Sequence, residues 1–264
     1  MKIAAFDMDG TVYIDHAIAP ETVQAIKDWR AAGNLAVSAT GKSIDSVRRA
    51  LEPFDVDMDY HVLYNGTVIT DANYGVLYEH HLDAEIVNEV AAHLDGTPGL
   101  NLYCTTLDGA DGIVTQGIPE SSNDFIQCPR VVSRAELEDE KVVLLSAYMP
   151  DNQPLQNQII PWINERYDVS TSLNTGFFDM MPPGHTKGTG LTWLLEHLGL
   201  PRAEVELFTF GDSFNDLPMH ELADASFTFP HAHPDVQARA HHVVADVPAG
   251  LRLARAGLSA SGGD

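Results

Sequence analysis

The sequence predicts an α/β protein, with a parallel sheet in a Rossmann-like core and an α+β domain inserted into that core. Short apolar runs alternate with segments of helical spacing toward both ends of the chain, as in βαβ units with right-handed crossovers. The middle of the chain changes to shorter apolar runs that resemble antiparallel hairpins. Acidic residues or glycines follow several of the core runs, and ligands of open α/β sheets bind at the carboxyl ends of strands.

The amino-terminal part shows this alternation element by element. The run Ile3–Ala5 predicts the first buried strand. Helical spacing of Val23, Ile26 and Trp29 predicts a crossover helix from Pro20 that stops at Gly33. The next predicted elements are a strand at Leu35–Ala39, a helix at Ser43–Leu51, a strand at His61–Tyr64 and a hairpin of Val68–Thr70 with Val76–Tyr78.

Residues 82–185 are expected to form the inserted α+β domain. Its predicted elements are helices at Ala84–Leu94 and Leu155–Arg166 and strands near Leu100–Thr105, Gly112–Gln116, Val142–Met149, Val169–Leu173 and Phe177–Met181. The core would consist of residues 1–81 and 186–264, and we expect its small-residue tail from about position 259 to be disordered. After the insertion we expect a helix at Gly188–Leu198, a strand at Val205–Phe210, a helix at Asp216–Leu222 and a strand at Ala225–Phe229.

Composition limits the classes of partner. The 264 residues include 38 acidic and 15 basic side chains, for a formal net charge of -23. Such a charge repels nucleic acid and anionic membranes, so we expect neither as a partner. The amino terminus carries no segment typical of a signal peptide, so we expect a cytoplasmic protein, as a monomer or a small homo-oligomer. Cys104 and Cys128 are expected to be buried thiols.

Four short motifs, far apart in the chain, carry the chemistry. Asp7-Met8-Asp9-Gly10-Thr11 follows the first strand, and Thr40-Gly41 follows the second. Lys187 precedes a predicted helix, and Gly211-Asp212-Ser213-Phe214-Asn215-Asp216 follows a third apolar run. Taken alone, the acidic motifs are typical of a helix cap or a turn and Thr40-Gly41 of a strand-to-helix turn, whereas Lys187 is typical of a solvated surface charge. Together, in this order, they predict a phosphate-transfer site.

The ordered set resembles the haloacid dehalogenase superfamily, and within it the Cof-type phosphatases of subfamily IIB, which have a C2-type cap between the second and third motifs. The resemblance extends from Lys2 to about Leu253. It implies an Mg²⁺-dependent phosphatase in which Asp7 is the nucleophile and Asp9 the general acid and base. It implies that the Asp7 carboxylate, the Asp9 backbone carbonyl and Asp212 bind the metal, with Asp216 supporting them through water.

The same resemblance assigns the phosphate-binding residues. Thr40, the Gly41 N–H and the Lys187 ammonium are expected to hold phosphoryl oxygens in the transition state. Gly10 and Thr11 are expected to provide the turn and its N–H donors, and Asn215 a polar contact to phosphate or substrate. The substrate is expected to be a small phosphorylated metabolite such as a sugar phosphate, because a large cap excludes bulky molecules.

Two positions depart from the family pattern. Lys42 stands where an arginine is usual after Thr-Gly, and a lysine provides charge without a bidentate fork. Pro230-His231-Ala232 replaces the Gly-Asn-Ala turn of many relatives. Two other functions stay open: a phosphotransferase of the phosphosugar mutase type, and a noncatalytic protein that binds phosphate compounds.

Overall fold

The computed structural model describes residues 1–107, 111–119, 126, 129–174 and 176–256. The chain divides into two compact units, one formed by Met1–Tyr78 together with the segment from Thr186 onward, and the other by Glu79–His185. We call them the core unit and the inserted unit. The tail expected to be disordered and Cys128 lie outside the described residues, whereas Cys104 is a buried free thiol.

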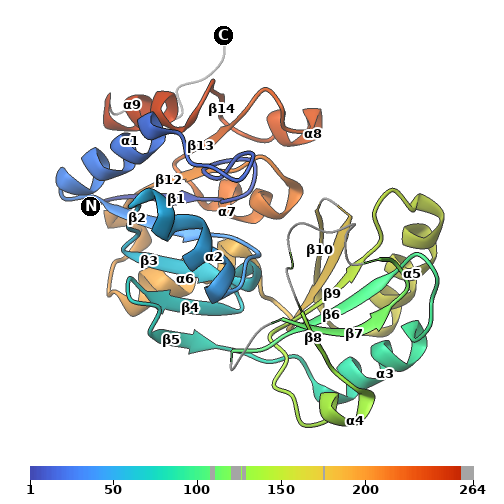
Figure 1. Cartoon of the computed structure of the whole chain (residues 1–264). Helices are drawn as coiled ribbons and strands as arrows, with labels where there is room; N and C mark the ends of the chain where they lie inside the picture. The colour runs from blue at the N-terminus through green and yellow to red at the C-terminus, as the bar shows by residue number, and fades with distance from the viewer. Residues whose placement is uncertain (108–110, 120–125, 127–128, 175, 257–264) are drawn as a thin grey trace. The chain divides into compact units, whose positions relative to one another are not determined.

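The core unit contains an eight-stranded sheet in the order β14-β13-β12-β1-β2-β3-β4-β5 (Figure 1). Neighbouring strands from β14 to β3 are parallel, and β4 is antiparallel to β3. The strands are β1 (Lys2–Phe6), β2 (Leu35–Ala39), β3 (Tyr60–Leu63), β4 (Val68–Asp71), β5 (Val76–Glu79), β12 (Glu206–Phe210), β13 (Ala225–Thr228) and β14 (His242–Val243). The prediction of a parallel-sheet core is therefore confirmed.

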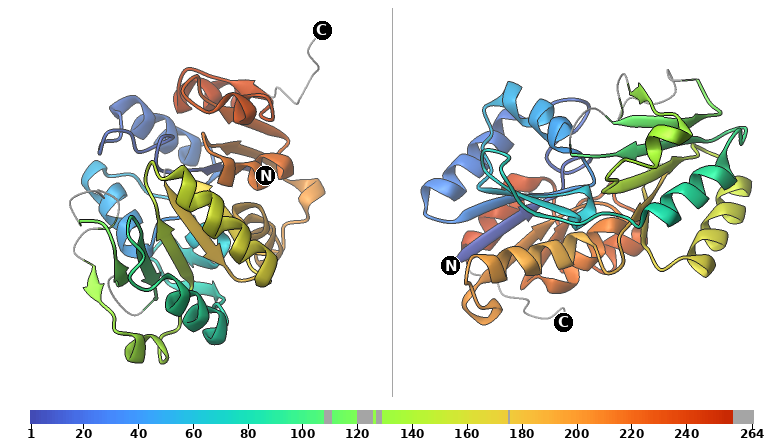
Figure 2. Two further views of the ribbon diagram at one scale, coloured as in Figure 1. Left: turned by 90° about the vertical axis from the view of Figure 1, so that its right-hand side faces the viewer. Right: turned by 90° about the horizontal axis from the view of Figure 1, so that it is seen from below.

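Helices cover both faces of this sheet. They are α1 (Pro20–Ala31), α2 (Ile44–Leu51), α6 (Lys187–His197), α7 (Leu217–Leu222), α8 (Pro234–Gln237) and α9 (Val247–Ala256), with 3₁₀ turns at Glu52–Phe54, Tyr64–Gly66, Arg202–Glu204 and Phe214–Asp216. Ile3 and Ala5 of β1 belong to a buried cluster with Leu191 of α6 and Met219 of α7. On the other face, Trp29 of α1 packs edge-on against the ring of Phe208, with α9 beside α1 (Figures 1 and 2).

The inserted unit has a six-stranded sheet in the order β10-β11-β9-β6-β7-β8. Its elements are α3 (Ala84–Leu94), β6 (Asn101–Thr105), β7 (Gly112–Gln116), β8 (Arg130–Val131), α4 (Arg134–Leu137), β9 (Leu144–Tyr148), α5 (Gln153–Arg166), β10 (Ser170–Asn174) and β11 (Phe177–Met181). Only the pair β7 and β8 is parallel among its described strand pairs.

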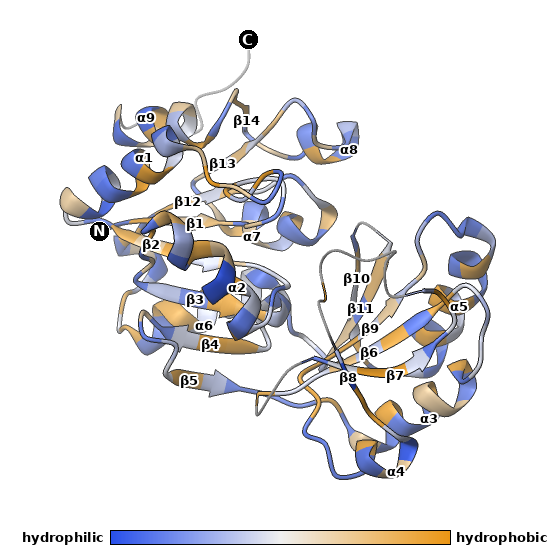
Figure 3. Cartoon of the chain, in the orientation of Figure 1, coloured by the Kyte–Doolittle hydropathy of each residue, from blue (hydrophilic) through white to orange (hydrophobic). Residues whose placement is uncertain are grey.

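One face of the inserted sheet packs against α3 and α5. Leu102 and Leu145 lie in a buried cluster with Val90 of α3 and Ile163 of α5. The expected α+β architecture is thus present. Figure 3 shows helices of both units carrying hydrophobic and hydrophilic residues on different sides, as amphipathic helices do. No helix of the described ranges is both long and apolar enough to span a lipid bilayer.

Candidate active site

The predicted motifs meet at one edge of the core sheet. Parallel register aligns Phe6, the last residue of β1, with Phe210 of β12 and with Ser38 of β2. The chain therefore leaves three neighbouring strands at the same edge, which is where open α/β sheets bind ligands. The backbone N–H of Asp7 still donates to the carbonyl of Phe210 at 2.8 Å, so the position of Asp7 is set by the sheet itself.

A tight turn follows Asp7. The carbonyl of Met8 accepts hydrogen bonds from the N–H groups of Thr11, Val12 and Tyr13, at 3.2, 3.0 and 2.8 Å. Gly10 has φ +81°, and a Cβ on this residue would lie 2.5 Å from Oδ2 of Asp212. Only glycine satisfies both conditions, because other residues avoid positive φ and have a Cβ. The turn therefore requires Gly10 in order to approach Asp212 closely.

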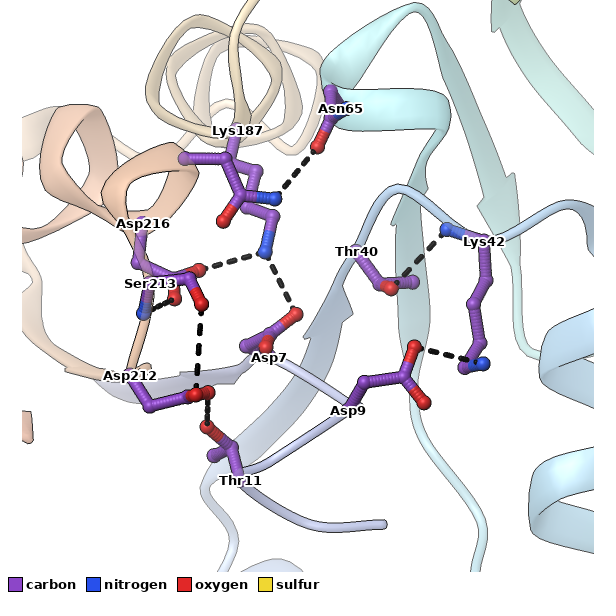
Figure 4. Close-up of polar contacts among 11 residues, drawn as sticks. Asp7, Asp9, Thr11, Thr40, Lys42, Asn65, Lys187, Asp212, Ser213 and Asp216 are labelled. Carbon is purple, nitrogen blue, oxygen red and sulfur yellow. Dashed lines mark hydrogen bonds and ion pairs between the residues drawn. The ribbon is translucent and has the colours of Figure 1, made fainter. Parts of the chain in front are cut away.

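Three carboxylates converge beside this turn. One oxygen each of Asp7, Asp212 and Asp216 lies within 4.8 Å of the others. The Lys187 ammonium lies 2.7 Å from Oδ1 of Asp7 and 2.6 Å from Oδ1 of Asp216, with its side chain fully buried (Figure 4). Thr11 donates from Oγ1 to Oδ1 of Asp212 at 3.0 Å. The motif after β1, the acidic motif after β12 and Lys187 thus share one buried polar cluster.

Helix α6 delivers Lys187 to this cluster. The helix begins at Lys187, and the Thr186 side chain caps it by accepting the N–H of Thr189. A Cβ on the next residue, Gly188, would lie 2.4 Å from the backbone oxygen of Pro218, so this first turn packs directly against α7. The close backbone approach holds the lysine inside the core unit.

The electrostatics of the cluster are unbalanced. Burial, together with the neighbouring charge of Asp216, raises the pKa of Asp7 well above its ordinary value despite the opposing effect of Lys187. Burial and Asp216 likewise raise the pKa of Asp212, although the hydrogen bond from Thr11 opposes this shift. Burial acts against the charged form of Lys187, but the carboxylates of Asp216 and Asp7 outweigh it and raise the pKa of the ammonium.

The donor set fits a hard divalent cation. Within the described residues, the three carboxylates of the cluster face a single ammonium group, so ionising all of them leaves negative charge in a buried place. A cation bound by carboxylate oxygens removes this penalty, and oxygen ligands are those that Mg²⁺ prefers. Without a cation, burial and the charges of neighbouring carboxylates raise the pKa values of Asp7 and Asp212, which is the expected behaviour of a carboxylate site for a metal ion.

Asp9 lies apart from the three carboxylates. Its Oδ2 is 2.8 Å from the Nζ of Lys42, and Figure 4 shows the two side chains pointing toward each other. The Lys42 ammonium also lies over the ring of Tyr13, 5.6 Å from its centroid. The side chain of Asp9 is 35% exposed and that of Lys42 11% exposed. The carboxylate of Asp9 is therefore paired with a cation of its own and open to solvent.

Thr40 and Gly41 occupy the turn after β2. The Thr40 N–H donates to the carbonyl of Val62 at 2.9 Å, while its buried Oγ1 accepts the N–H of Lys42 at 3.2 Å. A Cβ on Gly41 would lie 3.3 Å from the side-chain amide of Asn65. The small residue at position 41 therefore leaves room for Asn65.

Asn65 is a site residue that sequence reasoning missed. It follows β3 in a left-handed conformation with φ 54°, and its Oδ1 accepts a hydrogen bond from Asn215 at 3.1 Å. This contact ties the turn after β3 to the motif after β12. Oδ1 of Asn215 is buried and has no hydrogen-bond partner within the described residues. An Asn-Gly pair after a strand was the only signal, and it indicates a turn equally well.

The loop after β13 also reaches the site. Nε2 of His231 lies 2.9 Å from the carbonyl oxygen of Gly10 and 3.8 Å from Oδ2 of Asp212. His233, two residues later, instead accepts the N–H of Asp235 at the start of α8. The His233 ring lies beside that of Phe214, whereas among the described residues only His231 of these two histidines has a polar contact with Gly10 or Asp212.

Comparison with known proteins identifies the family. A family model described as haloacid dehalogenase-like hydrolase matches residues 4–249. The chain belongs to this family. It is therefore a hydrolase, and the expected membership of the haloacid dehalogenase superfamily is confirmed.

Curated relatives of this hydrolase are similar over most of their length. An HMP-PP phosphatase of Escherichia fergusonii is 25% identical over 248 residues, covering 92% of this chain and 89% of the relative. An HMP-PP phosphatase of Escherichia coli O8 is 26% identical over 251 residues, with the same coverage.

Solved structures show the same fold. A HAD subclass IIB sugar phosphatase superposes with a TM-score of 0.80 at 22% identity, covering 97% of this chain and 99% of the other. A haloacid dehalogenase-like hydrolase from B. subtilis gives a TM-score of 0.81 at 18% identity, covering 98% and 100%. The α/β core with its insertion is therefore an architecture shared with other members of the superfamily.

Proposed function

We propose that this hydrolase is an Mg²⁺-dependent phosphatase that cleaves a small phosphomonoester through an aspartyl-phosphate on Asp7. One observation carries the proposal: Lys187 is fully buried between Asp7 and Asp216 while Asp212 completes the carboxylate cluster. Burying three carboxylates around one ammonium is electrostatically unfavourable unless a further cation shares the site. A bound Mg²⁺ would supply that positive charge and would let the site accept an anionic phosphoryl group.

The residues that would hold Mg²⁺ follow from their hydrogen bonds. Asp216 uses Oδ1 for Lys187 and Oδ2 for the N–H of Ser213, at 2.9 Å, so it suits a supporting role. Asp7 and Asp212 would be the direct carboxylate ligands, and the backbone carbonyl of Asp9 would be the third protein ligand, as the family pattern implies. The bound ion would neutralise phosphoryl oxygens and allow an anionic nucleophile to approach an anionic ester.

Asp7 acts as the nucleophile, and Asp9 acts as the general acid and base. A carboxylate oxygen of Asp7 attacks phosphorus, and the bond from phosphorus to the ester oxygen breaks while Asp9 donates a proton to that oxygen. The carboxylate form of Asp9 then accepts a proton from a water molecule. The oxygen of this water attacks phosphorus, and the bond between phosphorus and Asp7 breaks. The ion pair with Lys42 fixes the Asp9 side chain apart from the three-carboxylate cluster, so the proton carrier is separate from the nucleophile.

The remaining predicted residues stabilise the phosphoryl group. Lys187 is already hydrogen-bonded to the nucleophile and compensates charge on the transferred oxygens. We assign the N–H groups of the Gly10–Thr11 turn, the Thr40 hydroxyl and the Gly41 N–H as donors to these oxygens. Asn215 holds Asn65 in place, and its buried Oδ1 provides an acceptor for a polar substrate group or water.

We propose further that the inserted unit serves as the cap and that the substrate is a small phosphorylated metabolite. Relatives over nearly the whole chain are named HMP-PP phosphatases, and a fold relative is named a sugar phosphatase. Both names describe small phosphate compounds. Sugar phosphates and HMP-PP are therefore the first substrates to test.

The deciding experiment is phosphate release by the purified chain with Mg²⁺, over a panel of sugar phosphates, HMP-PP, nucleotides and cofactor phosphates. We expect turnover of at least one small ester and none after chelation of Mg²⁺. Transfer of phosphate within a sugar bisphosphate without release would instead identify a mutase-type phosphotransferase. Binding of phosphate compounds without any turnover would contradict the enzymatic proposal.

A further inference from the structure

The loop after β13 is built to hold one imidazole in a fixed place. Phe229 and Ala232 close a turn through a hydrogen bond of 3.1 Å from the Ala232 N–H to the Phe229 carbonyl. The Gln237 side chain donates to the carbonyls of Pro230 and Ala232, at 3.1 and 2.8 Å, which are the residues on either side of His231. The side-chain amide of Gln237 thus fixes the backbone on both sides of His231.

The His231 ring itself is also oriented. It stacks on the buried ring of Phe229, with centroids 5.5 Å apart and an interplanar angle of 3°. Its Nε2 is 2.9 Å from the carbonyl oxygen of Gly10. Because a carbonyl oxygen only accepts, Nε2 must carry the hydrogen and donate it. The contact therefore selects the Nε2–H tautomer of His231.

The acceptor of this hydrogen bond sits in the turn that carries the proposed chemistry. Gly10 lies between Asp9 and Thr11, and its N–H donates to the Tyr13 carbonyl at 3.1 Å. Thr11 in turn donates to Asp212. His231 is also 3.8 Å from Oδ2 of Asp212, so the imidazole faces both the turn after β1 and the acidic motif after β12.

We propose that His231 is a positioning residue, which holds the turn of Asp7 to Thr11 against Asp212 through the carbonyl of Gly10. Among the described residues, His231 is the only one whose side chain is hydrogen-bonded to the Gly10 carbonyl. Without it, the turn keeps its internal hydrogen bonds but loses its anchor to the loop after β13. This inference rests on the proposed function, because it assigns His231 a part in aligning the nucleophile and the metal ligands.

The test compares three variants of the full chain. His231→Ala removes the donor, and His231→Gln retains an N–H donor at about the distance of Nε2. His233→Ala is the matched control, since this exposed histidine lies in the same loop and has its contacts with Asp235 and the exposed ring of Phe214 instead of with Gly10 or Asp212. We expect His231→Ala to lower kcat and the apparent Mg²⁺ affinity by about tenfold, the scale of lost metal-site support, with little change in substrate KM. We expect His231→Gln to recover most of both losses and His233→Ala to behave as wild type.

Two readouts do not depend on activity. Nitrogen NMR of histidine-labelled, metal-free protein should show His231 as the Nε2–H tautomer. Hydrogen exchange of the amides of residues 10–13 should accelerate by about fivefold in His231→Ala, the effect of one lost hydrogen bond, and stay unchanged in His231→Gln. An Nδ1–H tautomer, or equal exchange in all variants, would overturn the inference even if the enzyme were active. Conversely, an inactive wild type with these NMR and exchange results would overturn the proposed function alone.

Discussion

The ammonium of Lys42 lies 2.8 Å from Oδ2 of Asp9, and both groups belong to loops that leave neighbouring strands of the core sheet. The Lys42 ammonium also lies over the ring of Tyr13, which belongs to the same turn as Asp9. The proposed proton carrier is therefore fixed by a cation that follows the Thr-Gly motif. The departure from the usual arginine at position 42 thus affects the residue that we propose as the proton carrier.

Replacing Lys42 tests whether this pair aligns the proton carrier. We expect Lys42→Met to lower kcat/KM for an alkyl phosphate by about ten- to hundredfold, because a misplaced catalytic group loses that much rate. Lys42→Arg, which keeps the charge, should lose far less. Nitrophenyl phosphate needs little proton donation, so its hydrolysis should fall less than that of the alkyl ester. Equal losses for both esters would show that Lys42 acts on phosphate binding instead.

Asp7→Asn tests the nucleophile. We expect phosphate release to disappear, since an amide oxygen is a poor nucleophile, while the circular dichroism spectrum and melting profile stay those of a folded protein. Asp28→Asn is a suitable control, because Asp28 is an exposed carboxylate on α1. Phosphate release from Asp7→Asn at the wild-type rate would show that another group attacks phosphorus.

Removing the metal should expose the charge imbalance of the cluster. The raised pKa values of Asp7 and Asp212 mean that the fold favours their protonated forms, so without Mg²⁺ stability falls as the pH rises through those raised values. We expect Mg²⁺ to raise the melting temperature of wild type at neutral pH. In Asp212→Asn we expect a metal-free melting temperature at or above that of wild type and no response to Mg²⁺. A metal-free variant less stable than wild type would contradict this view of the cluster.

His61 predicts a separate pH dependence of stability. Its ring is buried, accepts or donates a 2.8 Å hydrogen bond with Ser38, and stacks on Tyr74. Burial lowers the pKa of His61 from 6.5 to about 4, although Asp71 and Asp59 act in the opposite direction. The unfolded chain therefore binds the proton first as the pH falls, and stability is lost between about pH 6.5 and 4.

We expect this titration to remove about 3 kcal/mol of the free energy of unfolding across that window, at 1.36 kcal/mol per pKa unit. Urea unfolding at several pH values should show a smaller pH dependence in His61→Phe than in wild type. His16→Asn replaces an exposed histidine of the same unit and should retain the wild-type slope. A wild-type slope in His61→Phe would assign the acid sensitivity to other groups.

Gly10→Ala tests the close approach of the turn after β1 to Asp212. Gly33→Ala is its control, because Gly33 has the same φ of +81° and no atom within 4 Å of an added Cβ. We expect Gly33→Ala to destabilise the fold by about 1 kcal/mol from backbone strain alone. Gly10→Ala should destabilise it further and reduce activity at least tenfold, because its Cβ displaces the Asp212 carboxylate. Full activity in Gly10→Ala would show that the turn tolerates a larger residue.

The sequence predicted the elements of the core and the clustered residues well, because both depend on local patterns. Apolar runs located the strands that precede Asp7, Thr40 and Asp212, and parallel topology then brings the ends of these strands to one edge. The contacts of Lys42, Asn65 and His231 could not be predicted, since each joins loops that are far apart in the chain and depends on side-chain distances.

Short elements also escaped prediction. Helices α4 and α8 have four residues each and strands β8 and β14 two each, which is too few for periodicity to show. Helix α9 is longer, but Pro248 and Gly250 make its sequence look like a turn. Proline is tolerated in the first turn of a helix, and a Cβ on Gly250 would lie 2.5 Å from the Phe210 ring. The residues that obscured this helix are those that let it start and pack.

The position of β1 between β2 and β12 has a consequence for how the protein is made. As the polypeptide emerges from the ribosome, β1 has a partner on one side only, and its other neighbour is translated after the whole inserted unit. Glu79–His185 is a continuous stretch and can complete its own sheet earlier. Until β12 has been synthesised, the nascent core therefore exposes an unpaired edge of β1. A chaperone would bind this edge during that interval.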